Sequence, residues 1–323
     1  MDKSTRIFLA GHRGLAGSAL LRRLRKSGYE NLILKRHDEL DLMDRIATFN
    51  FLREQQPDVV ILAAAIVGGI HANSSMPATF ISNNICIQTN VIDGAHRAGV
   101  EKLLFLGSSC IYPRDCPQPI KESYLLTGPL EFTNRPYAIA KIAGIEMCWA
   151  YNRQYGTRYL AVMPPNLYGI RDNFDLENSH VLQALIRKAH EAKVAGLRAI
   201  SAWGTGKARR EFLFSDDFAD ACLYLLNRLD ENGKGLIEDS HPPIINIGSG
   251  VDLTISELVA VVCEIVGFRG RIDWDYSKPD GTPQKLLDIS RLSLLGWKST
   301  TDLHEGIRVT YGDFLTQLHE ESE

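Results

Sequence analysis

The chain has 323 residues, of which 45% are hydrophobic and 23% charged, and its formal net charge is −3 at pH 7. Lysine and arginine are scattered in ones and twos, which excludes a basic stripe for nucleic acid and predicts no nucleic-acid partner. The longest run of apolar residues and glycine, residues 59–70, is well short of the roughly 20 residues that span a bilayer, so we predict no membrane association.

Strand-like runs rich in branched residues alternate with longer helical patterns along the first half of the chain. The predicted strands are Arg6–Ala10, Asn31–Lys35, Asp58–Ala63, Lys102–Gly107 and Tyr159–Met163. The predicted helices are Leu15–Ser27, Ile46–Gln55, Ala78–Ala98 and Tyr137–Tyr155. This alternation is typical of the α/β class and predicts a Rossmann-type doubly wound parallel sheet with helices on both faces.

The rhythm changes after Pro164, where a polar stretch from Arg171 to Ser179 is typical of a loop that leaves the sheet. Ile244–Ile247 has the pattern of a return strand, and Thr254–Val266 that of a helix in a second unit. We therefore predict a Rossmann domain over residues 1–170 with a return segment near 212–250. A smaller α/β substrate-binding domain is predicted from residues 171–211 and 251–323.

A glycine-rich loop follows the first predicted strand and opens the first helix, with the spacing Gly11, Gly14, Gly17. Glycines allow backbone amides to approach a pyrophosphate, and a helix N-terminus presents unpaired N–H groups to it. In this context the loop predicts a dinucleotide site, although a purely structural turn is the alternative. The loop residues are Gly11, His12, Arg13, Gly14, Leu15, Ala16 and Gly17.

The end of the second predicted strand indicates which dinucleotide binds. An NAD site usually has an acidic residue there, whereas this chain has Lys35, Arg36 and His37. Basic side chains, with Arg13 in the loop, attract the 2′-phosphate of NADP, so we predict NADP(H). The alternatives are a solvated basic cluster and a carboxylate position filled by Asp38.

A serine at the end of the fourth strand and a Tyr-x-x-x-Lys pattern form the main catalytic candidate. Tyr137 and Lys141 share one helix face, and Ser108 ends the strand. A tyrosine ordinarily has a pKa of about 10, and we expect the adjacent ammonium and a cofactor cation to favour the phenolate. Tyr137 is then a general acid/base, unless the pair is a chance surface pair.

The six cysteines show no CxxC or metal-ligand spacing, so we predict no metal site. They lie mostly in apolar segments, at positions 86, 110, 116, 148, 222 and 263. A reducing compartment suits them, and the polar stretch Met1–Arg6 does not resemble a signal peptide. We therefore expect a cytoplasmic protein.

Several longer stretches make the chain resemble the GDP-L-fucose synthase family of the extended short-chain dehydrogenase/reductase superfamily. The stretches that carry the resemblance are Ala10–Gly17, Val67–Asn73, Leu103–Pro113, Tyr137–Gly144, Asn166–Gly169, Glu177–Val181 and Lys278–Leu287. The resemblance implies conversion of GDP-4-keto-6-deoxy-D-mannose to GDP-L-fucose, by epimerisation at C3 and C5 and NADPH-dependent reduction at C4. The implied substrate is thus a GDP-linked 4-keto-6-deoxyhexose.

The resemblance also implies roles for individual residues. Cys110 would be the base and His180 the acid of epimerisation, with Ser108, Tyr137 and Lys141 completing the reduction. Without the resemblance, Cys110 reads as a small buried side chain, and His180 as a polar residue beside a Ser179 helix cap. Besides the glycine loop, the expected cofactor residues are Arg36, Leu106, Gly107, Ser108, Ser109, Lys141, Pro164, Pro165, Asn166, Leu167 and His180.

For the GDP end, the resemblance points to Lys188, Trp203, Arg210 and Lys285, which can neutralise a diphosphate and pack against the base or ribose. The alternative for the paired cations at 187–188 and 209–210 is a solvated surface pair.

The chain departs from the family pattern at Ile66, where lysine is usual, at Pro165, where threonine is usual, and at 214–215, where His-Val is usual. Pro165 puts cofactor affinity in doubt, and Ile66 could alter sugar recognition.

One rival function is that of another nucleotide-sugar enzyme of the superfamily, such as a 4-epimerase, a reductase or a 4,6-dehydratase. The other rival is a protein that binds the cofactor without catalysis. A dehydratase typically has Thr-Asp-Glu where this chain has Ser108, Ser109 and Cys110. The long patterns Ala78–Ala98 and Tyr137–Tyr155 predict a homodimer through a four-helix interface, although both could simply cover the sheet.

Overall fold

The computed structural model describes residues 1–176, 179–230, 235–278 and 280–320. Residues 231–234 of the predicted return segment lie outside the described residues, as do Glu177, Asn178 and Pro279 of the resembling stretches.

The larger part of the molecule is organised around a parallel sheet of six strands, in the order β2-β1-β3-β4-β5-β9. The strands are β1 (Ile7–Ala10), β2 (Leu32–Ile33), β3 (Val59–Leu62), β4 (Lys102–Leu106), β5 (Arg158–Met163) and β9 (Ile244–Asn246). The chain runs from β1 outward to β2 and then returns past β1 to β3. The predicted doubly wound parallel sheet is therefore confirmed, with its change of direction between β1 and β3.

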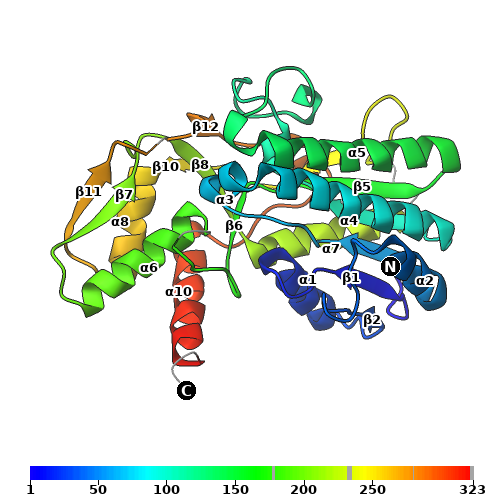
Figure 1. The fold of residues 1–323 in the computed structure, drawn as a ribbon, viewed down its shortest axis with the longest axis horizontal. Coiled ribbons are helices and arrows are strands. Elements are labelled where there is room, and N and C mark those ends of the chain that lie inside the picture. Colours follow the sequence, from blue (N-terminus) through cyan, green and yellow to red (C-terminus); the bar gives the residue numbers. More distant parts are fainter. Residues whose placement is uncertain (177–178, 231–234, 279, 321–323) are drawn as a thin grey trace.

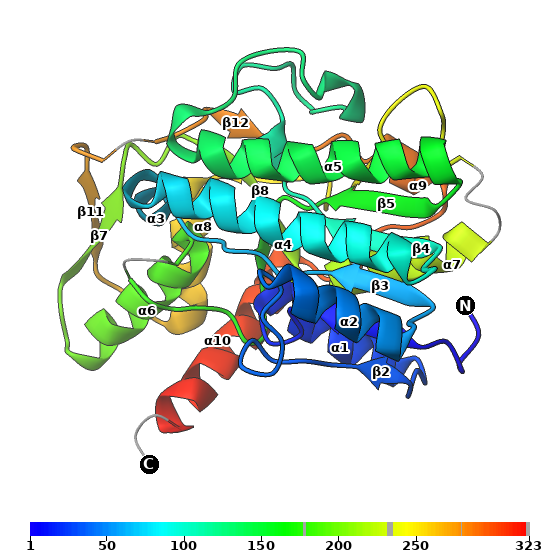
Figure 2. The same cartoon turned by 45° about the vertical axis from the view of Figure 1, so that its right-hand side comes forward.

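Helices cover both faces of this sheet because successive strand residues point to opposite sides. Ile7 and Leu9 of β1 pack into one hydrophobic cluster, and Phe8 and Ala10 into another. The first face carries α1 (Leu15–Lys26) and α7 (Ser215–Asp230). The second carries α2 (Arg45–Gln55), α4 (Pro77–Arg97) and α5 (Arg135–Tyr155), with α4 and α5 side by side in Figures 1 and 2.

A smaller unit with its own hydrophobic cluster lies beside the carboxyl ends of β1 and β4 (Figures 1 and 2). Its helices are α6 (Val181–Val194), α8 (Ile255–Val266) and α10 (Leu303–Glu320). Its strands are β6 (Asn166–Tyr168), β8 (Arg209–Phe214), β10 (Asp252–Thr254), β12 (Gln284–Lys285), β7 (Ala199–Trp203) and β11 (Arg271–Asp275). The first four form one sheet around β8, and β7 pairs with β11.

Some elements differ from the sequence expectations. The second strand is shorter than predicted because β2 is an edge strand that pairs only with β1. β6, predicted inside the first domain, pairs with β8 of the smaller unit. Leu292 of α9 (Ser290–Leu294) and Trp297, both predicted in the second domain, pack into the core beneath α1 and α7. The predicted division at residues 170 and 251 thus remains a hypothesis that these contacts refine.

Within the described ranges, none of the helices combines the length and apolar character that crossing a membrane requires.

Candidate functional site

A cavity of about 1030 Å³ opens at the carboxyl ends of β1, β3 and β4, where the chain order of the sheet reverses. Every site residue predicted from the sequence lines this one cavity. The predicted cofactor residues in its wall are Gly11, His12, Arg13, Gly14, Leu15, Ala16, Gly17, Arg36, Leu106, Gly107, Ser108, Ser109, Lys141, Pro164, Pro165, Asn166, Leu167 and His180. The remaining predicted residues there are Cys110, Tyr137, Lys188, Trp203, Arg210 and Lys285.

The glycine loop is shaped by close backbone contacts. Gly11 has a φ of +85°, and a Cβ there would lie 2.6 Å from the backbone nitrogen of Ala64. A Cβ on Gly17 would overlap the carbonyl oxygen of Gly11, whereas one on Gly14 would meet only that oxygen, at 3.7 Å. Gly14 is the N-cap of α1, and no described side chain caps it. Open space beside uncapped N–H groups fits a pyrophosphate.

The basic cluster after β2 faces the same cavity together with two acidic groups. Arg36 Nε lies 3.1 Å from Asp38 Oδ1 and 3.3 Å from Glu39 Oε2. These side chains are largely exposed, so the ion pairs contribute little and can exchange for a phosphate. Asp38 also lines the cavity, so both alternatives for this position are present at the cofactor end.

Ser108, Tyr137 and Lys141 converge where β4 meets α5. Ser108 is the hydrogen-bonding neighbour that acts to lower the pKa of the Tyr137 hydroxyl. Lys141 Nζ donates to the carbonyl oxygen of Leu106 at 2.8 Å and lies 5.8 Å from the centre of the Tyr137 ring. The three groups can therefore act on one substrate oxygen and the proton that it carries.

Burial shifts the protonation equilibria of two members of this set. Burial, followed by the nearby Cys110, raises the pKa of Tyr137 above its usual value, and the Ser108 hydrogen bond only partly opposes this. Burial also lowers the pKa of Lys141 to about 7. Without a cofactor cation, burial favours the neutral phenol, and the phenolate expected beside that cation stays a prediction. The neutral phenol is the form that donates a proton.

Cys110 lies in a short 3-10 helix (Ser109–Ile111) directly after β4. Asn134 Nδ2 donates to its sulfur at 3.2 Å, and Lys285 Nζ lies 3.8 Å from the same atom. The side chain is half-buried. The thiol therefore faces polar donors and is not the buried apolar side chain of the alternative interpretation.

His180 is the N-cap residue of α6, so Ser179 does not hold the cap position of the alternative interpretation. In the described chain the His180 side chain makes no capping hydrogen bond and borders the cavity instead. The surrounding protein lowers the pKa of His180 because it removes part of the hydration of the imidazolium.

The residues predicted for the GDP end line the same cavity but have different hydrogen-bond partners. Lys188 Nζ donates to Ser201 O at 3.1 Å, and Arg210 donates to Asp280 O at 3.0 Å. Burial lowers the pKa of both side chains, which argues against the solvated-pair alternative. Trp203 is 44% exposed. Lys285 lies instead beside the Cys110 sulfur.

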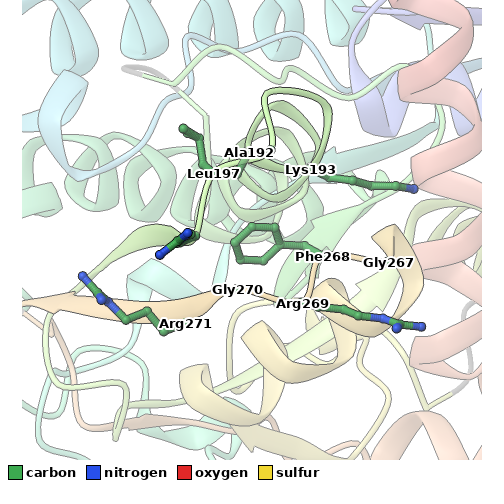
Figure 3. A pocket seen from close by; sticks show the side chains of 10 residues that line it. Ala192, Lys193, Leu197, Gly267, Phe268, Arg269, Gly270 and Arg271 are labelled. Atoms are coloured by element: carbon green, nitrogen blue, oxygen red, sulfur yellow. The ribbon is translucent and has the colours of Figure 1, made fainter.

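A second, more open pocket of about 470 Å³ lies between the ends of α6 and α8 and the start of β11 (Figure 3). The described residues that line it are Ala192, Lys193, Gly196, Leu197, Arg198, Gly267, Phe268, Arg269, Gly270 and Arg271. None of these side chains exchanges protons near neutral pH, and Arg269 and Arg271 extend in opposite directions in Figure 3. The described lining of this pocket therefore supplies no general acid or base for neutral pH.

Comparison with known proteins agrees with this geometry. The model of the NAD dependent epimerase/dehydratase family matches residues 7–248. This chain belongs to that family. It is 55% identical to GDP-L-fucose synthase 1 of Arabidopsis thaliana, over 98% of this chain and 95% of the relative. It is 50% identical to GDP-L-fucose synthase of Escherichia coli (strain K12), over 96% of each.

Solved structures of other epimerase/dehydratase-type proteins are also similar. A GDP-6-OMe-4-keto-L-xylo-heptose reductase from C. jejuni superimposes with a TM-score of 0.92 at 39% identity, covering 98% of this chain and 99% of that one. A GDP-L-fucose synthetase from Naegleria fowleri bound to NADP has a TM-score of 0.87 at 25% identity, covering 99% and 96%.

Sequence reasoning missed several residues that line the cavity. Residues 63–69 follow β3 at the same edge of the sheet as the glycine loop, and the rule that ligands bind at strand carboxyl ends could have found them. Asn134 and Asp280 had no such signal, because they reach the cavity from a short turn and a loop. The missed residues include Leu40, Asp41, Leu42, Met43, Ala63, Ala64, Ala65, Val67, Gly68, Gly69, Glu131, Thr133, Asn134 and Asp280.

The departures from the family pattern lie in two environments. Ile66 and Pro165 line the cavity. Asn84 holds the Ile66 backbone, accepting from its N–H and donating to its carbonyl oxygen, both at 2.9 Å. Phe214 packs instead in the core of the smaller unit. Only the first two positions can therefore contact a ligand.

Proposed function

We propose that this protein is a bifunctional 3,5-epimerase and NADPH-dependent 4-reductase that converts GDP-4-keto-6-deoxy-D-mannose to GDP-L-fucose. Relatives named GDP-L-fucose synthase, 50% and 55% identical over nearly the whole chain, support this proposal. The observation that carries it is the composition of one cavity. That cavity contains a Ser, Tyr and Lys set suited to ketone reduction, together with a cysteine and a histidine suited to moving carbon-bound protons.

The cofactor of the proposed reaction is NADP(H). The glycine loop and the uncapped start of α1 would hold the pyrophosphate, and Arg13 and Arg36 the 2′-phosphate. When bound, NADPH supplies the hydride for C4. The named Naegleria relative with NADP bound supports this choice of dinucleotide.

Epimerisation requires a base and an acid on opposite sides of the carbon that inverts. Protons beside a ketone are acidic, because the electron pair left behind spreads onto the carbonyl oxygen as an enolate. In the proposed step Cys110 sulfur takes the proton, and the C–H electron pair moves into the enolate. Ser108 and Tyr137 hydrogen-bond the C4 oxygen, and His180 returns a proton to the other face of the carbon.

Reduction uses the neighbouring groups of the same wall. Tyr137 donates its proton to the C4 oxygen as that oxygen gains negative charge, and its raised pKa keeps it protonated until then. Lys141, held by the Leu106 carbonyl oxygen, lies beside the Tyr137 ring and stabilises the phenolate that remains.

The GDP portion would lie across the smaller unit. Lys188 and Arg210 are the cations that would neutralise the diphosphate, and the exposed face of Trp203 is available for the base or ribose.

The test is incubation with GDP-4-keto-6-deoxy-D-mannose in deuterated water, with and without NADPH. We expect deuterium at C3 and C5, and one NADPH oxidised per sugar. NADPH oxidation without deuterium uptake would make the protein a simple 4-reductase, like the named heptose reductase. A 4-epimerase would consume no NADPH. If the protein showed neither deuterium uptake nor NADPH oxidation, the sugar assignment would be refuted.

We further infer a cytoplasmic homodimer that associates through α4 and α5. These helices lie side by side on the outside of the sheet (Figure 1), and Ile85 and Ile139 are exposed on them. The neighbouring Phe132 is 81% exposed. Six free thiols, all in the described chain, suit a reducing compartment. Sedimentation as a monomer at micromolar concentration would refute the dimer, and secretion of the tagged protein would refute the location.

A further inference from the structure

Two groups beside Cys110, the side chains of Asn134 and Lys285, take no part in the steps proposed above. Asn134 is the N-cap residue of α5, a position where asparagine normally caps the helix through its side chain. Here the side chain makes no capping bond to any described residue, and Nδ2 donates to Cys110 Sγ at 3.2 Å. The amide thus forgoes a favourable local hydrogen bond and contacts the sulfur.

The other atom of the same amide is also unusual. Asn134 Oδ1 is buried and has no hydrogen-bond partner in the described part of the chain. Buried polar atoms without partners are rare, because each one has lost its hydration without replacement. The orientation of this amide is therefore explained by what its nitrogen does at the sulfur.

Lys285 approaches the sulfur from the smaller unit. It lies opposite Arg210 in the register of β12 with β8, and its Nζ is 3.8 Å from Cys110 Sγ. Over the described ranges, Lys285 forms no ion pair with a carboxylate, whereas Arg210 donates to the carbonyl oxygens of Arg209 and Asp280. The Lys285 ammonium is therefore the cation available to a negative charge on the sulfur.

We propose that Asn134 and Lys285 are positioning residues that hold Cys110 as a thiolate, Asn134 through its N–H group and Lys285 through its charge. A lysine beside a cysteine favours the thiolate, which is the form that removes a proton. This inference rests on the proposed function only for the identity of the proton. It moves Lys285 from the diphosphate, to which the family resemblance assigned it, to the epimerisation base.

The proposed step balances without a further reactant. The thiolate forms an S–H bond as the sugar C–H bond breaks, and the electron pair goes to the ketone oxygen. After each inversion the thiol returns its proton to water and His180 regains one from water, so that both groups are restored before the next carbon is inverted. The other groups that influence the sulfur are Tyr137 from α5, Arg210 from β8 and, through Arg210, Glu131.

The first experiment measures the thiolate without substrate. The rate of Cys110 alkylation by iodoacetamide is followed against pH by peptide mass spectrometry, in the wild type and in Lys285→Met, Lys285→Arg and Asn134→Ala. For Lys285→Met we expect a shift of about one pH unit upward, so that the rate at neutral pH falls about 10-fold. Arginine should restore most of the rate, and Asn134→Ala should lower it by a smaller factor.

The controls separate this effect from a loosened fold. Lys188→Met makes the same change at a lysine of the same cavity whose ammonium bonds Ser201 O, and it should leave Cys110 alkylation unchanged. Cys263, in α8, serves as an internal reference for local opening. An unshifted Cys110 profile in Lys285→Met, or an equal change at Cys263, would overturn the proposal.

The second experiment connects the thiolate to turnover. In Lys285→Met, deuterium uptake at C3 and C5 should fall in kcat while KM for the GDP-sugar stays constant. A raised KM with unchanged kcat would assign Lys285 to the diphosphate and reject the inference. If the wild type exchanges no deuterium but the alkylation shift is found, the proposed function fails and the thiolate assignment stands.

Discussion

The two ends of the large cavity are constructed in different ways. The phosphate-binding part of the cofactor end is made by consecutive residues, 11–17, which run from the end of β1 into the first turn of α1. The sugar end is made by side chains that come from separate elements, with Cys110 after β4, Asn134 before α5, His180 before α6 and Lys285 in β12. A local backbone feature forms one end, and long-range packing forms the other.

Because of this difference, the two ends of the cavity tolerate different amino-acid substitutions. At the cofactor end, added atoms collide with backbone that cannot move, as the close approach of Gly11 to Ala64 shows. At the sugar end, side chains can be exchanged without disturbing the sheet. We therefore expect substitutions at the sugar end to change chemistry, and substitutions in the glycine loop to change stability and cofactor binding together.

The largest effect is expected from Cys110→Ser. Removal of a general base typically lowers a rate by about 10²-fold to 10⁴-fold, and the serine hydroxyl is a much weaker base than a thiolate. Deuterium uptake at C3 and C5 should fall by such a factor, while NADPH binding, measured by fluorescence titration, stays unchanged. A loss of NADPH affinity instead would show that the two ends are not separable.

Lys141→Met should stabilise the ligand-free protein at neutral pH. The folded pKa of about 7 lies below the usual 10.5, so the unfolded chain binds the proton more readily, and native stability rises with pH between these values. Each unit by which the pKa of Lys141 is lowered corresponds to about 1.4 kcal/mol. After subtraction of the lost hydrogen bond to Leu106, the free energy of unfolding should increase by about a few kcal/mol.

The check for this prediction is urea unfolding at several pH values. The difference between Lys141→Met and the wild type should shrink as the pH rises from 7 towards 10.5. A difference that does not depend on pH would mean that charge burial is not its cause. NADPH oxidation should be lost in the same variant.

Gly11→Ala, at the cofactor end, and Gly28→Ala, just after the C-terminal end of α1, form a matched pair. Both glycines have positive φ, at +85° and +80°, which costs an alanine about 1–2 kcal/mol. Only Gly11 also meets backbone, at Ala64, whereas no described atom lies within 4 Å of a Cβ on Gly28. Overpacking should add about 1–3 kcal/mol for Gly11→Ala.

Denaturant unfolding and NADPH titration measure the two consequences together. Gly28→Ala should bind NADPH like the wild type, and Gly11→Ala should bind it less tightly. Equal losses of stability in both variants would contradict the role assigned to the contact with Ala64.

The smallest effect is expected from Arg36→Ala. The side chain is 52% exposed and already shares its charge with Asp38 and Glu39, so its loss should weaken NADPH binding only about 5-fold to 10-fold and leave NADH binding unchanged. Asp38→Asn should act in the opposite direction and favour NADPH. Equal weakening of both cofactors by Arg36→Ala would remove this residue from the 2′-phosphate site.

Much of the fold was predictable because its signals are local. The strands β1, β3, β4 and β5 match their predicted ranges within a residue at each end, since each is a run of branched residues buried on both faces. The edge strand β2 has partners on one side only, and its length was overestimated. Leu292 and Trp297 lie in the predicted second domain but pack into the core of the larger part. No periodic pattern in the sequence signals this contact.

The sequence by itself determined the parallel sheet, the phosphate-binding loop and the Tyr137 and Lys141 pair, because each has a local signal: alternating strand and helix patterns, glycines three residues apart, and two side chains four residues apart on one helix face. Only the tertiary structure decided the pKa values of Tyr137 and Lys141 and which side chains surround Cys110. Lys285 lies 175 residues from Cys110 in the chain. Its contact depends on how the smaller unit packs against the sheet, and burial depends on every segment that covers a side chain.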